Sequence, residues 1–220
     1  MCGIVGYTGS HPALARVIEG LRRLEYRGYD SAGIALVGKP GDALVVAKKA
    51  GKLSNLESAL TSNYESAMSG IGHTRWATHG GPTDTNAHPH LSNDGKLAVI
   101  HNGIIENYVE LKTDLQKRGH TFTSETDTES VAHLLSDEFS KVGNLAEAMR
   151  SVCKQLRGSF TLLAIHSDSP KTIIGARRNS PLVVGVGEGE NFLASDVSAF
   201  ISHTKKALEL GQDQVVEVTP

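Results

Sequence analysis

The chain begins Met1-Cys2-Gly3-Ile4-Val5-Gly6, a short apolar run punctuated by glycine that predicts a buried strand over residues 3–8. Methionine is normally removed when a small residue follows it, and this processing would leave Cys2 at the chain terminus. A terminal cysteine carries a thiol and an α-amine whose ordinary pKa of about 7.7–8.0 leaves it partly neutral near neutral pH. Cys2 would then supply both a nucleophile and a base. The alternative is a small hydrophobic residue that only starts a strand.

The composition is that of an ordinary globular protein, and it excludes several classes of function. The chain has 220 residues, with 22 Lys+Arg against 24 Asp+Glu, and this length predicts one domain over residues 1–220. Near-neutrality argues against a nucleic-acid or membrane-surface partner, since both need a basic excess. No apolar run is long enough to span a membrane. Two cysteines, Cys2 and Cys153, make no disulfide framework and no secretory signal is visible, so we expect a cytoplasmic protein.

Hydrophobic periodicity predicts about four helices and nine or ten strands. Helical spacing runs over residues 12–24, 105–117, 126–142 and 145–156, with shorter helices from residue 54 and at 196–200. Strand-like runs lie at 3–8, 32–37, 43–49, 70–74, 96–101, 159–166, 172–176, 182–186, 192–194 and 215–218. Strands and helices occur in blocks rather than in strict alternation. This order favours an α+β fold with antiparallel sheets over a doubly wound parallel sheet.

Two Ser/Thr-x-x-Glu patterns predict capping boxes at helix starts. They are Ser54 with Glu57 and Thr126 with Glu129. Between the second pair, Asp127 is less well explained by capping. An amino-acid substrate is a zwitterion, and its site therefore needs one cation and one anion. Arg75 offers a bidentate fork for an α-carboxylate, and Asp127 could hold the α-ammonium.

Half of the histidines lie in one segment, residues 73–101, which is dense in functional side chains. They are His73, His79, His88, His90 and His101. One hypothesis is a metal site with His88 and His90 as two ligands. However, no Asp, Glu or Cys stands at a familiar metal-ligand spacing, and neither HExxH nor CxxC occurs. We therefore expect no metal, and a hydrogen-bonded structural role is the alternative for each histidine.

The tripeptide His101-Asn102-Gly103 is predicted to end a strand and enter a turn. Glycine there allows a close approach to a backbone N–H, and the neighbouring asparagine side chain can donate a second hydrogen bond. Two donors aimed at one point are what an oxyanion hole requires. The alternative is an ordinary turn, because Asn-Gly is a common turn dipeptide.

Taken together along nearly the whole chain, these motifs resemble the class II glutamine amidotransferases. The motifs span residues 1–6, 25–33, 73–80, 86–90, 101–107, 124–129, 180–182 and 194–196. Within that class, Glu-Tyr-Arg-Gly-Tyr-Asp-Ser at 25–31 and Thr-Arg-Trp-Ala-Thr-His-Gly at 74–80 look like the glutaminase domains of the glucosamine-6-phosphate synthase family. The families that form phosphoribosylamine or asparagine share the Cys2 start and an Arg-Gly motif with different surroundings.

The resemblance implies the N-terminal-nucleophile hydrolase fold, a four-layer αββα sandwich of two antiparallel sheets. It implies that Cys2 attacks the side-chain amide of L-glutamine while its α-amine moves the proton. It also implies that Asn102 and the Gly103 N–H stabilise the oxyanion of the tetrahedral intermediate. No cofactor or metal is expected for this chemistry.

Further roles follow from the same resemblance. Arg75 and Asp127 would hold the α-carboxylate and the α-ammonium of glutamine. Thr78 and His79 would line the pocket, and Trp76 would gate the passage of ammonia. The resemblance implies supporting roles for three more residues, which are Arg27, His88 and His101.

The resemblance also implies a partner for this domain. Members of the synthase family carry a sugar isomerase half with a fructose 6-phosphate site, and we expect that half to be absent from residues 1–220. The chain by itself would release ammonia rather than transfer it. Three alternatives are a glutaminase domain of another class II amidotransferase, a non-catalytic glutamine-binding module, and a histidine-rich metal hydrolase.

Overall fold

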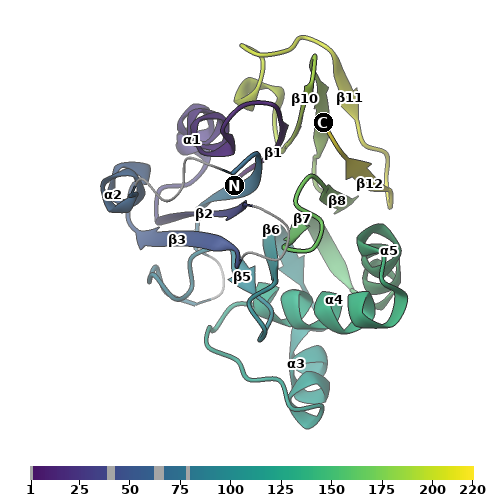
Figure 1. The fold of residues 1–220 in the computed structure, drawn as a ribbon. Coiled ribbons are helices and arrows are strands. Elements are labelled where there is room, and N and C mark those ends of the chain that lie inside the picture. Colours follow the sequence, from purple (N-terminus) through teal and green to yellow (C-terminus); the bar gives the residue numbers. More distant parts are fainter. Residues whose placement is uncertain (1, 39–42, 62–66, 78–79) are drawn as a thin grey trace.

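The computed structural model describes residues 2–38, 43–61, 67–77 and 80–220, and these form two antiparallel sheets stacked between two groups of helices (Figure 1). The seven-stranded sheet has the order β11-β9-β10-β1-β4-β2-β3, and the five-stranded sheet has the order β12-β8-β7-β6-β5. The first sheet comprises β1 (Gly3–Gly9), β2 (Ser31–Val37), β3 (Val45–Ala50), β4 (Ser69–Arg75), β9 (Val183–Val186), β10 (Glu190–Ala194) and β11 (Ala207–Glu209). The second comprises β5 (His90–Leu91), β6 (Leu97–Ile105), β7 (Gly158–His166), β8 (Ile173–Arg178) and β12 (Val215–Val218).

The helices cover the outer faces of the two sheets. The helices on the sheets are α1 (Ala13–Leu24), α2 (Leu53–Ala59), α4 (Thr128–Val142) and α5 (Leu145–Gln155), whereas α3 (Tyr108–Lys117) packs on α4. Two short 3-10 helices are η1 (Glu25–Arg27) and η3 (Val197–Ala199). In Figure 1, α1 and α2 lie beside the seven-stranded sheet, while α4 and α5 lie beside the five-stranded sheet. The structure thus has four layers in the order helix, sheet, sheet and helix. This confirms the predicted α+β sandwich.

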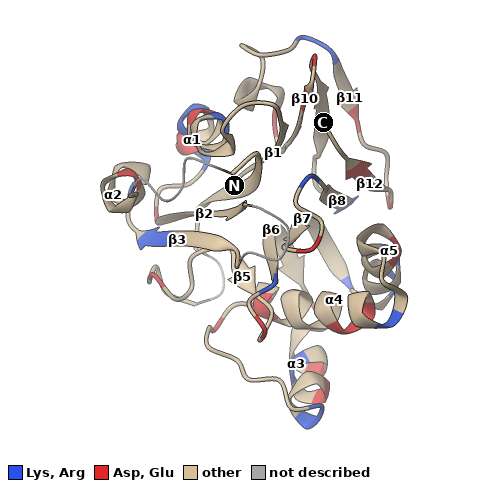
Figure 2. Ribbon diagram, in the orientation of Figure 1, with Lys and Arg blue, Asp and Glu red and all other residues tan. Residues whose placement is uncertain are grey.

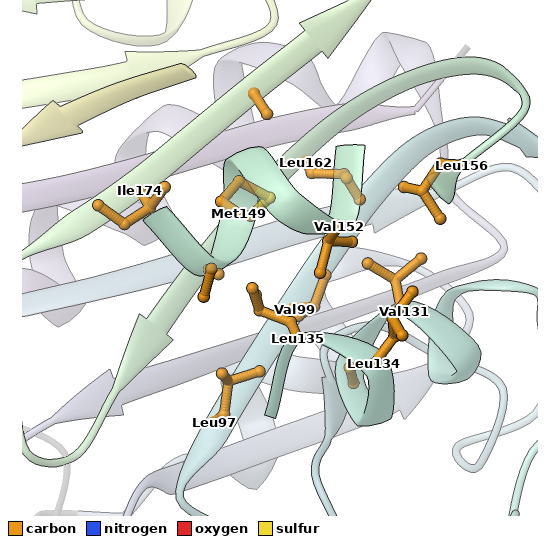
Figure 3. Close-up of a cluster of buried hydrophobic side chains, with 14 of the residues drawn as sticks. Leu97, Val99, Val131, Leu134, Leu135, Met149, Val152, Leu156, Leu162 and Ile174 are labelled. Carbon is orange, nitrogen blue, oxygen red and sulfur yellow. The ribbon is translucent and has the colours of Figure 1, made fainter. Parts of the chain in front are cut away.

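Three apolar cores hold these layers together. One core lies between the sheets, where Ile4 and Ile71 of the first sheet meet Ile100 and Leu163 of the second. A second fills the space under α1 and α2. The third packs α4 and α5 on the five-stranded sheet, and Figure 3 shows Val99 of β6 among the side chains of these helices. The sheets are therefore buried on both faces, which explains why their strands are apolar without clear alternation.

The register of the seven-stranded sheet places the N-terminus beside the end of β4. β1 is a central strand, with Gly3 opposite Thr74 on one side and Val5 opposite Ala194 on the other. Cys2 directly precedes β1, so it lies next to the residues that follow Thr74. Pairing on both sides fixes a segment that would otherwise fray as a chain end.

The predicted turn at residues 101–103 is wrong. β6 continues through Asn102 and Gly103 to Ile105, because the nine residues of β7 pair with its whole length. The following helix accordingly begins at Tyr108 rather than at residue 105. Gly103 has φ +127°, and a Cβ there would lie 2.0 Å from the Ser159 carbonyl oxygen. Glycine is thus required by a close approach between two strands and not by a turn.

Both predicted capping boxes are also wrong. α2 begins at Leu53 after Lys52, so Ser54 lies inside the helix. α4 begins after Asp127, whose side chain makes no cap hydrogen bond. The Glu129 carboxylate instead accepts hydrogen bonds from the backbone N–H groups of Thr123 and Ser124, which ties the preceding loop to the helix. Two short strands, β5 and β11, were not predicted because they are too short to show a period.

Lys and Arg residues alternate along the outer helices with Asp and Glu residues, as the ribbon colours of α1 and α3 show in Figure 2. Among the described residues, no helix has the length and apolar character needed to cross a membrane.

A close approach at Gly33 attaches the segment around His88 to β2, and it gives a test of the fold. A Cβ on Gly33 would lie 2.0 Å from the His88 carbonyl oxygen and 3.0 Å from that of Ala47. We expect Gly33→Ala to lower the free energy of unfolding by about 1–3 kcal/mol in urea titrations, because backbone must move. Gly81→Ala is the control, since nothing lies within 4 Å of its Cβ position. Equal urea midpoints for the two variants would contradict the expected crowding.

Candidate active site

One cavity of about 350 Å³ lies where the start of β1, the ends of β4 and β6 and the start of α4 meet. This volume is in the range of small-molecule sites. Nine of the residues predicted from the sequence line it: Cys2, Arg27, Arg75, Trp76, His88, His101, Asn102, Gly103 and Asp127. Thr78 and His79, which were predicted to line the same pocket, lie outside the described residues.

The Cys2 thiol lies against the backbone of Trp76. Its Sγ accepts a hydrogen bond from the Trp76 N–H at 3.1 Å. Burial raises the pKa of the Cys2 thiol, and the Trp76 N–H and the Arg75 charge offset part of that rise by stabilising the thiolate. The thiol is therefore mainly protonated at neutral pH, and a nucleophilic role requires a base that takes its proton.

The Asn102 side chain links the two sheets at Cys2. Its Nδ2 donates to the Cys2 carbonyl oxygen at 2.9 Å, and its Oδ1 lies 2.9 Å from His73 Nε2. Because Nδ2 carries two hydrogens, the amide brings a hydrogen-bond donor to the immediate neighbourhood of the cysteine. Gly103 follows it in β6 and also lines the cavity. The Asn102 side chain of the predicted donor pair thus lies beside the predicted nucleophile, and Gly103 lines the same cavity.

The cavity contains one buried cation and one buried anion. Arg75 at the end of β4 is 3% exposed, and its guanidinium donates to the carbonyl oxygens of Gly80 and Gly81 at 3.1 and 3.2 Å. Asp127 is 5% exposed and accepts a hydrogen bond from the Ile105 N–H at 2.8 Å. Opposite charges on two buried side chains of one cavity are suited to a zwitterionic ligand.

Three buried histidines pack against one another at the site, and two of them, His73 and His88, line the cavity. The His73 and His88 rings stack with centroids 4.2 Å apart, and His88 meets His90 edge to face at 4.9 Å. Burial lowers the pKa of His73 and of His90 to about 3 each and lowers that of His88 well below its ordinary value, so all three are neutral at pH 7. Within the described residues, no three His, Cys, Asp or Glu side chains are grouped so that they could hold a metal ion.

Two further contacts shape the mouth of the cavity. Arg27 makes an ion pair of 2.5 Å with Asp196, which connects η1 to the residue before η3. The Trp76 ring is 46% exposed and meets Tyr29 edge to face at 5.3 Å. A large aromatic side chain at the mouth is placed where it could cover the cavity.

Sequence reasoning missed three residues of this site. His73 was noticed only as one of several histidines, yet it contacts Asn102. Asp30 accepts a hydrogen bond from the Ala77 N–H at 2.8 Å, and the Ser195 hydroxyl accepts one from the Ile4 N–H at 3.1 Å. Asp30 and Ser195 lie within motifs that carried the resemblance. Their hydrogen-bond partners are distant in the chain, and no local sequence pattern indicates such contacts.

A family model described as a glutamine amidotransferase domain matches residues 73–202. The chain belongs to this family.

Its relatives and structural neighbours agree with that assignment. The chain is 64% identical over 219 residues to a glutamine–fructose-6-phosphate aminotransferase (isomerizing) of Streptomyces coelicolor, a match that covers 99% of this chain and 35% of the relative. The enzyme of the same name from Leifsonia xyli is 59% identical, with 100% of this chain and 36% of the relative covered. The chain thus spans about a third of the length of the curated relatives it matches.

Two solved structures superpose on nearly the whole chain. The glutamine phosphoribosylpyrophosphate amidotransferase from B. subtilis, complexed with ADP and GMP, matches with a TM-score of 0.82 and 27% identity over 99% of this chain and 47% of that chain. A structure described as the allosteric regulatory enzyme of purine biosynthesis matches with a TM-score of 0.83 and 28% identity, again over 99% of this chain and 47% of its own. The predicted N-terminal-nucleophile hydrolase fold is confirmed.

The raised pKa of Cys2 predicts how its alkylation depends on pH. Because only the thiolate reacts, labelling of a Cys153→Ala variant by iodoacetamide should accelerate about tenfold per pH unit from about pH 7 to about pH 9, and it should stay slower than labelling of free cysteine. Intact-mass spectrometry measures the rate. A labelling rate that reaches its plateau below about pH 8 would mean that the pKa of the Cys2 thiol is not raised.

Proposed function

We propose that the chain hydrolyses the side-chain amide of L-glutamine to glutamate and ammonia through a thioester on Cys2. One observation carries the proposal: the Cys2 thiol, the Asn102 amide donor and the opposite charges of Arg75 and Asp127 line one cavity of about 350 Å³. A nucleophile, an oxyanion donor and a paired charge site are together what amide transfer from an amino acid requires.

The proposed reaction has two halves. After removal of Met1, the Cys2 α-amine accepts the thiol proton while Sγ bonds to the amide carbon of glutamine. The Asn102 side chain and the Gly103 N–H stabilise the oxyanion of the intermediate. The amine then gives its proton to the departing nitrogen, which leaves as ammonia. In the second half, water attacks the thioester carbon and loses a proton to the amine. The bond between Sγ and that carbon then breaks, the amine returns the proton to the departing sulfur, and glutamate leaves the restored cysteine.

Recognition in this proposal depends on paired charges. The Arg75 guanidinium binds the α-carboxylate, which is a stronger acceptor than the Gly80 and Gly81 carbonyl oxygens it contacts in the free protein. Asp127 binds the α-ammonium. We propose further roles for other residues: lining of the pocket by Thr78 and His79, gating of ammonia by Trp76, and support by Arg27, His88 and His101.

We further propose that residues 1–220 form one glutamine amidotransferase domain of a cytoplasmic enzyme. Because the curated relatives are nearly three times as long and are named glutamine–fructose-6-phosphate aminotransferase, the proposed partner is a sugar isomerase domain with a fructose 6-phosphate site. The ammonia would then be used to form glucosamine 6-phosphate. Neither a cofactor nor a metal is needed for the glutaminase steps.

The nucleophile is tested by removing the Cys2 thiol. Cys2→Ala should abolish the release of glutamate and ammonia from glutamine, measured with glutamate dehydrogenase on Met1-trimmed protein. Cys153→Ala is the matched control and should keep activity, because Cys153 packs against the α4–α5 core and burial raises its pKa to about 11. Tight glutamine binding without turnover in the wild-type chain would instead favour a non-catalytic binding module. Turnover that persists in Cys2→Ala would exclude the thioester.

The proposed ammonium site is tested by Asp127→Asn. Asparagine keeps an oxygen that can accept from the Ile105 N–H but loses the negative charge. We expect KM for glutamine to rise by about 10- to 100-fold, since a hydrogen bond to a charged group contributes about 1.5–3 kcal/mol. Asp137→Asn, on the outer part of α4 in an ion pair with Arg118, is the control. An unchanged KM would mean that the ammonium group binds elsewhere.

A further inference from the structure

His73 connects the two sheets at the Asn102 side chain. It lies in β4, is 1% exposed, and lines the same cavity as Cys2. Its Nε2 lies 2.9 Å from Asn102 Oδ1 and 3.1 Å from the His101 carbonyl oxygen. Both contacts cross from the seven-stranded sheet to β6 of the five-stranded sheet.

These partners define which ring nitrogen of His73 carries the proton. The His101 carbonyl oxygen can only accept, so Nε2 must donate. His73 Nδ1 has no hydrogen-bond partner among the described residues, and a proton there would be a buried, unpaired donor. Burial lowers the pKa of His73 to about 3, which keeps the ring neutral. His73 is therefore a neutral imidazole that donates from Nε2.

This donor selects one of the two orientations of the Asn102 amide. An asparagine amide can turn by 180° and exchange its oxygen and nitrogen in almost the same volume. In the observed orientation, Oδ1 accepts from His73 and Nδ2 donates to the Cys2 carbonyl oxygen. In the turned orientation, Nδ2 would face the His73 N–H and Oδ1 would face the Cys2 oxygen, so both hydrogen bonds would be lost.

We propose that His73 is a positioning residue for glutamine hydrolysis, which keeps the Asn102 amide nitrogen, rather than its oxygen, directed at the reacting centre beside Cys2. The inference rests on the proposed function, because Nδ2 must face the developing oxyanion. An oxyanion donor contributes only if it is oriented before the reaction, and a turned amide would present a repelling oxygen. His73 itself need not contact the glutamine amide.

The effect should appear in kcat and not in KM. His73→Phe keeps a ring that can stack on His88 but removes the donor. We expect kcat for glutamine to fall at least about tenfold with KM within about threefold, because an interaction made in the transition state is weakened. His73→Gln, whose terminal NH₂ can reach a similar position, should recover most of the loss. His166→Leu is a control at the far end of β7, where another buried histidine pairs across from Leu97.

A double-mutant cycle separates positioning from a general structural role. If His73 acts through Asn102, then His73→Phe should cost less than about twofold in kcat when Asn102 is already alanine. Losses that multiply in the double variant would overturn the proposal, as would a full kcat in His73→Phe or a loss seen only in KM. Urea unfolding of each variant identifies one that does not fold, and His73→Leu then replaces His73→Phe in the cycle.

The outcomes also distinguish this inference from the proposed function. A wild-type chain without Cys2-dependent glutaminase activity contradicts the function itself. An active, Cys2-dependent wild type whose kcat is unaffected by the loss of the His73 donor contradicts only the positioning role.

Discussion

The hydrogen bond from Asn102 Nδ2 to the Cys2 carbonyl oxygen is the contact on which the site depends. A residue at a chain end has few covalent constraints and tends to fray. Here β1 pairs with a strand on each side. Cys2, which precedes β1, is held by the side chain of Asn102 from the opposite sheet. That contact exists only because the two sheets pack face to face through side chains such as Ile4 and Ile100. The sandwich core therefore sets the position of the cysteine.

Burying so many polar groups between two sheets has a cost, and the chain limits it in two ways. The three buried histidines, His73, His88 and His90, are neutral, so their burial does not require removing a charge from water. Arg75 and Asp127, the buried charged side chains that line the cavity, have opposite signs and make hydrogen bonds to backbone groups. The result is a cavity that holds one charge of each sign beside neutral polar side chains.

The sequence predicts the elements of this fold better than their ends, and the site residues better than their contacts. Long periodic runs such as α5 and β7 were predicted within about two residues, because their pattern reflects burial directly. The prediction of a turn at Asn102 was wrong because the strand that pairs with β6, β7, lies more than fifty residues further along the chain. Motif resemblance predicted roles for Cys2 and Asn102, which line one cavity. It could not show that His73 lies between Asn102 and the His101 carbonyl oxygen, because that contact arises from sheet packing.

The cavity and the backbone that borders it are not independent. On one side of residues 78–79, the Ala77 N–H donates to Asp30, and on the other side the Gly80 carbonyl oxygen accepts from Arg75. The Trp76 N–H donates a hydrogen bond to the Cys2 thiol, and the next residue, Ala77, is held by the Asp30 carboxylate. A ligand carboxylate at Arg75 must share the guanidinium donors with the Gly80 and Gly81 carbonyl oxygens. Filling the charge site and rearranging the mouth of the cavity thus involve the same hydrogen bonds.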